Sequence, residues 1–355
     1  MAKLGDISAP RLIKILLEKS AGARCIDVRS PGEFAQGSIP FFSNLPILDN
    51  QERHQIGICY KEEGQESAIT LGHRLVADHK NSLIASWLQL LGEGTPGYVC
   101  CWRGGLRSRT AQEWIQQAGG NVLQVVGGYK GLRRELLKSF DHLPELLVLS
   151  GPTGSGKTRL LDRLQVPMLD LEKLANHRGS VFGKYGASAQ PAQASFENTI
   201  AFNLLKSPAN NLLVEDESLM IGSVHLPLAI HKKLAAAPVV QIQESLETRV
   251  ENILQEYVHQ PLAAGMAPLE LQQSLEDSVM KISKKLGGQK TTEVLASIRL
   301  GIFTKNQDIH KDWIRNLLEH YYDKAYAYGF KKSQRTIVFQ GDWNECHHWI
   351  QKKFA

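Results

Sequence analysis

The chain has 355 residues, which is too long for one comfortable hydrophobic core and predicts two domains. Hydrophobic residues make up 43% of it and charged residues 22%, a composition typical of globular proteins, and no apolar run is long enough to span a membrane. The formal net charge of +5 is mild, and alone it barely favours a nucleic-acid partner.

The cysteine pattern and the N-terminus indicate the compartment. The five cysteines are an odd number without paired spacing, which argues for a reducing compartment and against a disulfide framework. Residues 1–6 do not open a signal peptide. No cysteine–histidine cluster has the spacing of metal ligands. We therefore expect a cytoplasmic protein with no membrane contact, no structural metal and no permanent cofactor.

The first third of the chain alternates short strands and helices. Residues 11–19 place apolar side chains at helical spacing, and residues 24–29 form a short apolar strand. Turn signals at 37–40 and 44–46 enclose a second strand. Residues 61–94 predict a helical stretch whose apolar positions belong mostly to the core.

A cysteine-bearing loop lies between a strand end at 98–99 and a helix at 110–115. Its glycines let the backbone curl so that N–H groups point inward, and the helix N-terminus adds partial positive charge. Both effects stabilise a thiolate and an anion beside it. Two arginines add full positive charge and suit tetrahedral oxyanions. The motif consists of Cys100, Cys101, Trp102, Arg103, Gly104, Gly105, Leu106, Arg107 and Ser108.

We predict that Cys101 is the nucleophile and that residues 102–108 bind its anionic partner. Five residues separate Cys101 from Arg107, a spacing shared with tyrosine-phosphatase-like loops, so the loop alone does not choose between phosphate, sulfur and selenium. Cys100 has three interpretations: a disulfide with Cys101, a resolving thiol, or a small strand residue. Trp102 either stacks on an unstacked target base or packs beneath the loop.

Short motifs around this loop resemble the rhodanese family. They cover about residues 8–138, and the Cys101 loop falls where that family places its persulfide-forming cysteine. The resemblance implies a rhodanese-like domain at 1–140, followed by a linker at 141–144. One departure is the spacing, because common rhodanese loops have four residues between Cys and Arg. The motifs are Ile26-Asp27-Val28-Arg29, Glu33-Phe34, Gly37-Ser38-Ile39-Pro40, Asn44-Leu45-Pro46 and Gly127-Gly128-Tyr129.

A second motif follows a buried strand at 146–150 and precedes a helix at 159–164. It matches the full phosphate-loop pattern, whose backbone N–H groups cradle linked phosphates. Lys157 can reach the outer phosphate, and Thr158 can hold Mg²⁺ if the ion is present. The motif consists of Gly151, Pro152, Thr153, Gly154, Ser155, Gly156, Lys157 and Thr158.

An acidic strand end accompanies this phosphate loop. Residues 211–214 form an apolar strand followed by three acids, the candidates for a magnesium shell, and Asp170 ends another strand. Repeated strand–helix units predict a P-loop NTPase-like, doubly wound parallel sheet. This domain spans 145–355 and carries a helical appendage at about 246–330. The three acids are Glu215, Asp216 and Glu217.

Basic residues gather in three places along the chain. Each group is either an RNA contact or a solvated helix face, and the sequence does not choose between them. The first group is Lys130, Arg133, Arg134 and Lys138, the second Lys281, Lys284, Lys285 and Lys290, and the third Lys331, Lys332 and Arg335.

Taken together, the two motifs and several shorter ones resemble the tRNA 2-selenouridine synthase family, a rhodanese–P-loop fusion. The resemblance implies a transferase that acts on 2-thiouridine at the wobble position, U34, of the lysine, glutamate and glutamine tRNAs. It implies S-geranylation by geranyl diphosphate, then replacement of sulfur by selenium from selenophosphate, with Cys101 carrying selenium as a perselenide. The shorter motifs are Gly127-Gly128-Tyr129-Lys130, His177-Arg178-Gly179-Ser180, Phe182-Gly183, Ala194-Ser195-Phe196-Glu197-Asn198, Glu215-Asp216-Glu217-Ser218 and Met220-Ile221-Gly222.

The same resemblance implies a monomer that binds the anticodon stem-loop and takes selenophosphate from a supplying enzyme. Selenophosphate and geranyl diphosphate are then co-substrates, and Mg²⁺ is an optional ion at the phosphate loop. The loop ligand remains open between geranyl diphosphate and ATP or GTP. Two other functions also remain: a nucleotide-regulated rhodanese-type sulfurtransferase or persulfide carrier, and a phosphatase-like enzyme using Cys101 and Arg107.

Overall fold

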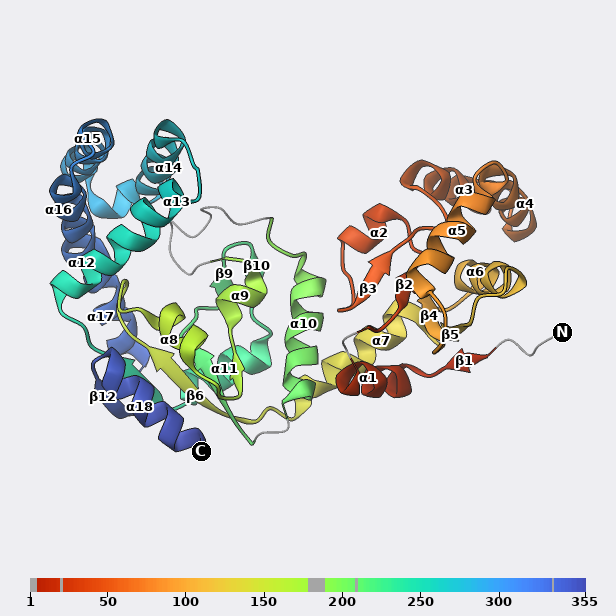
Figure 1. Ribbon diagram of the computed structural model, residues 1–355, viewed down its shortest axis with the longest axis horizontal. Coiled ribbons are helices and arrows are strands. Elements are labelled where there is room, and N and C mark those ends of the chain that lie inside the picture. The colour runs from red at the N-terminus through yellow and green to blue at the C-terminus, as the bar shows by residue number, and fades with distance from the viewer. Residues whose placement is uncertain (1–4, 20–21, 178–188, 208–209, 334) are drawn as a thin grey trace. The chain divides into compact units, whose positions relative to one another are not determined.

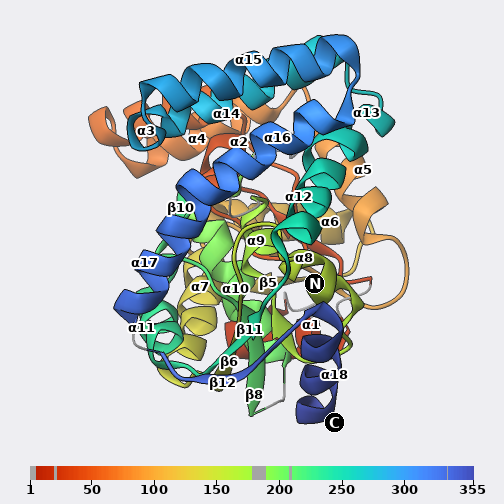
Figure 2. The ribbon, with the colours of Figure 1, turned by 90° about the vertical axis from the view of Figure 1, so that its left-hand side faces the viewer.

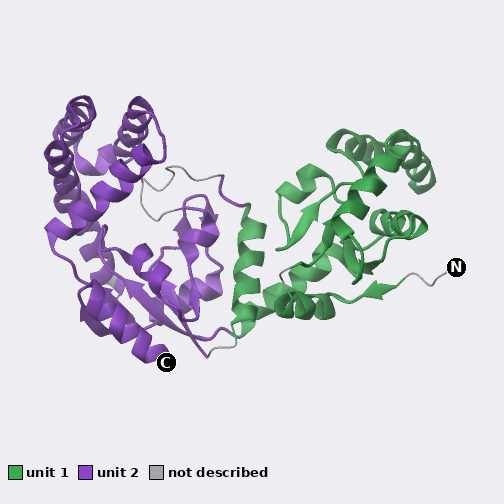
Figure 3. Cartoon of the chain, viewed as in Figure 1, with its two compact units in different colours: residues 1–142, 192–207 green, residues 143–191, 208–355 purple. Residues whose placement is uncertain are grey.

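The computed structural model describes residues 5–19, 22–177, 189–207, 210–333 and 335–355. The chain forms two compact units, coloured separately in Figure 3. Unit 1 comprises Met1–His142 with Ala192–Ser207, and unit 2 comprises Leu143–Pro191 with Pro208–Ala355. Within the described ranges, no helix is both long and apolar enough to cross a membrane.

Unit 1 is built on a five-stranded sheet with the order β1-β5-β4-β2-β3. Every neighbouring pair is parallel, so the carboxyl ends of the strands meet at one edge, where the cysteine loop follows β4. The strands are β1 (Asp6–Ile7), β2 (Cys25–Asp27), β3 (Phe42–Asn44), β4 (Gly97–Cys100) and β5 (Val122–Val125).

Helices connect these strands, and local signals set where they begin (Figure 1). Ser30 and Glu33 form a capping box at α2, and Asp49 and Glu52 form another at α3. The helical stretch expected at 61–94 consists of the end of α3, then α4 and α5, with breaks after α3 and α4. The helices are α1 (Ala9–Glu18), α2 (Pro31–Ala35), α3 (Asn50–Glu62), α4 (Gln65–Val76), α5 (Lys80–Leu91), α6 (Leu106–Gln117), α7 (Gly128–Leu137) and the 3₁₀ turn η1 (Lys138–Asp141).

Helix α10 (Gln193–Lys206) belongs to unit 1, although the segments before and after it belong to unit 2. Its Ala201 and Phe202 join the hydrophobic core that also contains residues of α1 and α7. Ser195 Oγ accepts a 2.9 Å hydrogen bond from the backbone N–H of Ser38. The sequence assigned this helix to a continuous second domain at 145–355, and the structure differs because the apolar face of α10 packs on unit 1.

Unit 2 contains a second five-stranded parallel sheet with the order β12-β11-β6-β8-β7. The chain passes from β6 to one side of the sheet and later to its other side, so the strand order reverses around β6. Ligands of such sheets bind at this reversal, beyond the carboxyl ends of the strands. The strands are β6 (Glu145–Ser150), β7 (Met168–Leu169), β8 (Asn211–Glu215), β11 (Val239–Ile242) and β12 (Ile337–Gly341), with a separate antiparallel pair β9 (Met220–Ile221) and β10 (Val224–His225).

Helices also follow the strands of unit 2, and a helical layer precedes β12. This layer confirms the expected appendage and has its own core, which includes Leu254, Leu271, Val279 and Ile298. Figure 2 shows α14 and α15 side by side within it. The helices are α8 (Lys157–Arg163), α9 (Leu171–Ala175), α11 (Leu228–Ala236), α12 (Leu246–Leu254), the π-helical η2 (Gln255–His259), α13 (Gln260–Ala263), α14 (Pro268–Leu286), α15 (Gly288–Thr304), α16 (Gln307–Leu317), the π-helical η3 (Leu318–Tyr322), α17 (Asp323–Ser333) and α18 (Trp343–Phe354).

Candidate functional site

Cys101 follows β4 directly, and its side chain is 3% exposed. Its sulfur lies 3.2 Å from Ser108 Oγ and 4.0 Å from the carbonyl oxygen of Gly105. Gln124 of β5 donates hydrogen bonds to Ser108 Oγ at 2.8 Å and to the carbonyl oxygen of Gly104 at 2.9 Å. A buried amide on the neighbouring strand therefore fixes the loop that surrounds the sulfur.

Two glycines let this loop lie against the turn before α7. Gly104 has φ +66° and Gly128 has φ +55°, a region that favours glycine. A Cβ on Gly128 would lie 2.2 Å from the carbonyl oxygen of Cys101, and one on Gly104 would lie 2.6 Å from that of Val125. The same Cys101 carbonyl accepts a 2.8 Å hydrogen bond from Tyr129 N–H. Any side chain at either glycine would displace the Cys101 loop.

The two arginines of the loop have different surroundings. Arg107 forms a bidentate pair with Glu33 of α2, at 2.5 Å and 3.0 Å, whereas Arg103 is exposed. Burial opposes ionisation of Glu33, but the pair with Arg107 lowers the pKa of this carboxyl below its usual value. The Arg107 guanidinium is thus oriented and its charge largely balanced, while Arg103 can turn towards an incoming anion.

Trp102 packs beneath the loop. Its ring stacks on Tyr129, with centroids 5.3 Å apart, and the Arg29 guanidinium lies 5.5 Å from the Trp102 ring and 3.9 Å from the Tyr129 ring. Arg29 is itself buried and paired with Asp27 at 2.7 Å. Of the two interpretations of Trp102, these contacts support the packing role. Asp27 and Arg29, prominent in the sequence motif, form the polar base of this stack.

Cys100 points into the interior. It is fully buried among core residues and, like the other four cysteines, has a free thiol. Burial, reinforced by the charge of Asp27, raises the pKa of the Cys100 thiol well above its usual value. These surroundings favour the strand-residue interpretation over a resolving thiol, because a resolving thiol has to ionise and reach its partner.

The phosphate loop connects β6 to α8 in unit 2. Lys157 opens α8, and its Nζ donates a 2.7 Å hydrogen bond to the carbonyl oxygen of Gly151. Gly154 and Gly156 have φ of +83° and +80°. Ser155 Oγ is buried and has no hydrogen-bond partner among the residues that the structure describes. The eight residues expected from the motif therefore form a loop at the carboxyl end of β6 together with the first residues of α8.

Three side chains that the sequence analysis missed hold the outer face of this loop. Arg249 of α12 donates to the carbonyl oxygen of Thr153 at 2.8 Å, and Asn252 donates to that of Gly154 at 2.9 Å. Trp343 of α18 donates to the carbonyl oxygen of Gly156 at 3.1 Å. These bonds hold three loop carbonyls against α12 and α18. Arg249 and Asn252 are polar residues of the helical appendage and Trp343 begins the last helix, and no motif in the sequence relates them to the phosphate loop.

The three acidic residues expected after β8 have different partners. Glu215 accepts a 2.9 Å hydrogen bond from the backbone N–H of Glu172. Asp216 forms a bidentate pair with Arg335, both contacts at 2.8 Å. Burial, together with the charge of Glu172 and against that of Lys157, raises the pKa of Glu217 to about 8. The sequence analysis missed Glu172, which α9 brings to this cluster.

The hydroxyl and carboxylate groups of these residues are of the chemical type that binds a magnesium ion. Thr158 Oγ1 lies 3.4 Å from Glu172 Oε2, which places a hydroxyl beside the carboxylate cluster. Oxygen ligands are those that Mg²⁺ prefers. Within the described ranges, however, no group of three or more Asp, Glu, His or Cys side chains converges as a ready metal site. Any ion here would therefore need water or phosphate oxygens to complete its coordination.

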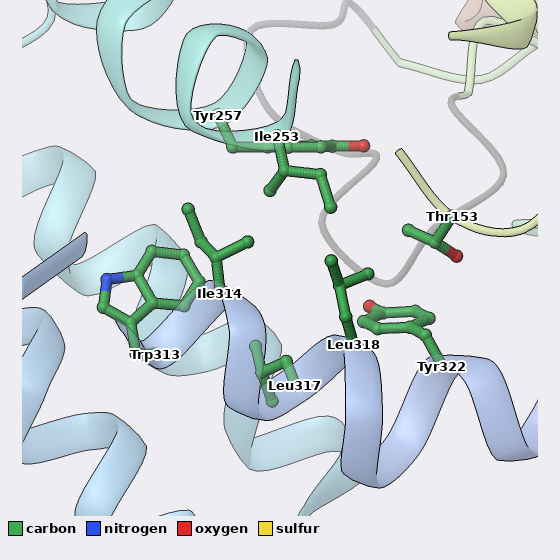
Figure 4. A pocket seen from close by; sticks show the side chains of 8 residues that line it. All are labelled: Thr153, Ile253, Tyr257, Trp313, Ile314, Leu317, Leu318 and Tyr322. Atoms are coloured by element: carbon green, nitrogen blue, oxygen red, sulfur yellow. The ribbon is translucent and has the colours of Figure 1, made fainter. Parts of the chain in front are cut away.

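An apolar pocket adjoins the phosphate loop at Thr153 (Figure 4). Both π-helical segments contribute to it, with Tyr257 from η2 and with Leu318 and Tyr322 from η3. It is narrow, with about 20 Å³ of accessible space, so a ligand would have to part its walls. The other lining residues are Ile253, Trp313, Ile314 and Leu317.

The basic groups are partly used inside the units. Arg133 pairs with Glu197 of α10 and donates to Asn198 Oδ1 at 2.8 Å, so it holds α10 in unit 1. Arg335 is likewise occupied by Asp216. Lys130, Arg134, Lys138, Lys281, Lys284, Lys285 and Lys331 are exposed, and Lys290 is half-buried. The side chain of Lys332 and the motif residues Arg178, Gly179, Ser180, Phe182 and Gly183 lie outside the described residues.

A parallel sheet whose first strand leads into a phosphate loop defines unit 2 as a P-loop-type domain, and unit 1 adds a cysteine held at the carboxyl edge of a second parallel sheet. Residues 144–355 match the family model of the tRNA 2-selenouridine synthase AAA domain. The chain belongs to the tRNA 2-selenouridine synthase family, which confirms the resemblance seen in the sequence.

Relatives with this name match nearly the whole chain. The tRNA 2-selenouridine synthase of Shewanella loihica is 41% identical over 351 residues, which cover 94% of each chain. That of Pseudomonas syringae pv. tomato is 39% identical over 350 residues, covering 92% of this chain and 94% of the relative. That of Photobacterium profundum is 39% identical over 345 residues, with the same coverage.

Proposed function

We propose that this chain converts 2-thiouridine to 2-selenouridine at U34 of the lysine, glutamate and glutamine tRNAs. The observation that carries the proposal is the presence, in one chain, of a cysteine loop at 100–108 and a phosphate loop at 151–158. Relatives named for this activity match both units, which supports it. Unit 1 acts in this proposal as a rhodanese-like domain, supported by Cys101 at the carboxyl edge of five parallel strands.

The first step is S-geranylation at the phosphate loop. The thiocarbonyl sulfur of the base attacks C1 of geranyl diphosphate, the C–O bond breaks, diphosphate leaves, and the base releases its N3 proton. Loop N–H groups and Lys157 stabilise the diphosphate, so no nucleotide is hydrolysed. Thr158 and Glu217 would hold a magnesium ion here, and the ion would neutralise part of the diphosphate charge. We assign the ten-carbon chain to the apolar pocket at Thr153, which has to widen on binding.

The second step replaces sulfur by selenium at the cysteine loop. Alkylation turns a poor leaving group into a good one, because the sulfur can now depart as geranyl thiolate. Loop N–H groups with Arg103 and Arg107 hold the phosphate part of selenophosphate. Water releases selenide from it together with phosphate. The free Cys101 thiol first exchanges with a small external disulfide, which releases one thiol and leaves a mixed disulfide on Cys101. Selenide then displaces the second thiol from this mixed disulfide to form the perselenide.

Delivery returns the loop to its starting state. The perselenide selenium bonds to C2 of the base, and geranyl thiolate leaves and takes a proton from water. A second thiol then attacks the Cys101 sulfur, the S–Se bond breaks, and the mixed disulfide forms again. The thiol is regenerated over the cycle, so the net reaction consumes the geranylated base, selenophosphate and water. Cys100 is too deeply buried to act as this second thiol, so we assign the role to a small external thiol.

Mass spectrometry of nucleosides tests the proposal. A 2-thiouridine anticodon stem-loop is incubated with geranyl diphosphate alone and then with selenophosphate, a small thiol and its disulfide, for wild type and Cys101→Ser. We expect geranylated nucleoside with both proteins and selenouridine with wild type only. If no modified nucleoside forms under any condition, the synthase proposal is wrong, and hydrolysis of a generic aryl phosphate would then test the phosphatase-like alternative.

A further inference from the structure

A wide hollow in unit 1 lies between α3, α4 and the cysteine loop. It offers about 860 Å³ of accessible space, against about 20 Å³ for the pocket beside the phosphate loop. Its size falls in the range of about 300–1,000 Å³ that small-molecule sites occupy. This hollow can therefore take a nucleobase with a long substituent without rearrangement, whereas a whole tRNA arm is far too large for it.

The walls of this hollow are apolar. Ile47 and Leu48, which follow β3, are 5% and 7% exposed, and Trp114 of α6 is 8% exposed. Ile56 of α3 and Ile69 of α4 are half-buried and complete the walls. Apolar surface of this kind stabilises an alkyl chain by removing it from water.

The rim of the hollow is basic. Arg53, Lys61 and Arg103 are exposed lining residues, and none of the lining residues, which all lie in the described ranges, is acidic. Arg107 also lines it, but its charge is balanced by Glu33. An apolar interior with a cationic rim matches an alkylated base whose flanking phosphates remain at the surface.

The hollow adjoins the nucleophile through one residue. Gly105 lines it, and the Gly105 carbonyl oxygen lies 4.0 Å from the sulfur of Cys101. A group held in the hollow is therefore separated from the sulfur by little more than one turn of loop backbone. The leaving thiol and the incoming selenium can then occupy opposite sides of the base.

We infer that this hollow receives the S-alkylated wobble base, with the alkyl chain against Ile47, Ile56 and Ile69 and the neighbouring phosphates at Arg53, Lys61 and Arg103. The inference rests on the proposed function, which supplies the S-geranylated base. It assigns the geranyl chain two places: beside the phosphate loop as a diphosphate, and in unit 1 as the group that leaves from the base.

Equilibrium binding of two labelled anticodon stem-loops tests the inference on the full chain, without selenophosphate. One carries S-geranyl-2-thiouridine and the other S-methyl-2-thiouridine, which differ only in the chain. Fluorescence anisotropy should give an S-geranyl Kd at least about tenfold lower for wild type. Ile69→Glu, which puts a carboxylate in the apolar wall, should reduce this ratio to about twofold or less and keep the S-methyl Kd.

Ile58→Glu is the matched control, because Ile58 lies on α3, is 42% exposed and does not line the hollow. It should keep the wild-type ratio. Unchanged S-methyl binding shows that Ile69→Glu is folded, and Ile69→Ser should reduce the ratio in the same direction. Equal Kd values for the two stem-loops with wild type, or a full ratio with Ile69→Glu, would overturn the inference. Wild type that keeps the ratio but forms no selenouridine with selenophosphate would refute the proposed function and still support the hollow as the alkyl site.

Discussion

The hydroxyl oxygen of Ser108 lies 3.2 Å from the sulfur of Cys101 and accepts a hydrogen bond from Gln124 at 2.8 Å. Because Gln124 occupies a lone pair of this oxygen, the hydroxyl proton is directed either to the Gly105 carbonyl, 3.1 Å away, or to the sulfur. When Cys101 ionises, the bond to the thiolate is the stronger one. Ser108 is therefore positioned to stabilise the nucleophile.

Removal of the Ser108 hydroxyl should make Cys101 react more slowly with an alkylating reagent. We expect Ser108→Ala to lower the rate of Cys101 alkylation by iodoacetamide at pH 7 by about tenfold, which corresponds to about 1.4 kcal/mol for one charge-assisted hydrogen bond. Ser108→Thr, which keeps the hydroxyl, is the matched control. Peptide mapping of the alkylated site gives the rate at Cys101 alone. An alkylation rate equal to wild type in Ser108→Ala would mean that the bond to sulfur contributes nothing.

The pair of Arg107 with Glu33 should make unit 1 sensitive to acid. The pKa of Glu33 is lowered from its ordinary value of 4.5, so the pair stabilises the fold fully above that pH and the stabilisation is lost as pH falls through the folded-state pKa. We expect Glu33→Gln to lower the free energy of unfolding by about 1–3 kcal/mol at pH 7. This variant should also lose less stability than wild type as pH falls below 4.5.

Urea unfolding at several pH values measures this effect. Glu18→Gln, at the exposed end of α1, is the control and should follow the wild-type curve. Parallel curves for Glu33→Gln and wild type would contradict the assignment of acid sensitivity to this pair.

Lys157 should separate the two chemical steps. Lys157 is the first residue of α8, and its ammonium group lies against the backbone of the phosphate loop, where we expect the departing diphosphate. We predict that Lys157→Ala loses geranylation by about 100-fold or more, as for removal of one transition-state charge contact. Selenation of a stem-loop that already carries S-geranyl-2-thiouridine should stay within about twofold of wild type. Equal loss of both steps would indicate that the phosphate loop drives a shared conformational change instead.

Local sequence signals predicted the elements that bear the chemistry, because each depends on neighbouring residues. The strand before Cys101, the phosphate loop and the helical appendage all lie where the apolar periodicity and the glycines indicate. In the same way, Gly128 was identifiable as part of a tight turn. The reason why glycine is needed at this position is the close approach of the Cys101 carbonyl, which lies well before it in the chain.

Tertiary contacts account for what the sequence left out. The motif at 194–198 was noted in the sequence, but the contacts of α10 with unit 1 were not. They combine the packing of Ala201 and Phe202 with the pair of Arg133 and Glu197, residues that sequence spacing does not relate. In unit 2, Asp216 looked like a metal ligand, and its pairing with Arg335 follows only from the parallel sheet. Ion pairs between distant segments carry no periodic signal, so composition and spacing do not reveal them.

The raised pKa of Glu217 predicts how unit 2 responds to alkali. In the folded chain this carboxyl has a pKa of about 8, above its ordinary 4.5, so its contribution to stability is complete below pH 4.5 and is lost as pH rises through 8. We expect Glu217→Gln to be more stable than wild type by about 1–3 kcal/mol at pH 8.5 and to show little difference at pH 5.

Thermal unfolding across this pH range measures the difference, with Glu270→Gln on the exposed first turn of α14 as control. Added Mg²⁺ should raise the wild-type Tm more at pH 8.5 than at pH 6.5, because metal binding competes with the proton. A Glu217→Gln variant that loses stability at pH 8.5 would show that the ionised carboxylate has a favourable partner there.

Two adjacent arginines on α7 allow structural and RNA-binding roles to be separated. Arg133 is half-buried and pairs with Glu197 of α10, whereas Arg134 is exposed. We expect Arg133→Ala to lower the unfolding free energy by about 1–3 kcal/mol and to speed amide hydrogen exchange in α10, because it leaves Glu197 without this partner. Arg134→Ala should leave the unfolding free energy and the exchange in α10 unchanged.

If the exposed residue contacts tRNA, Arg134→Ala should weaken stem-loop binding. It should also reduce the salt dependence of log Kd by about one phosphate contact. Unchanged exchange in α10 for Arg133→Ala would mean that its apolar face alone, through Ala201 and Phe202, holds the helix in unit 1.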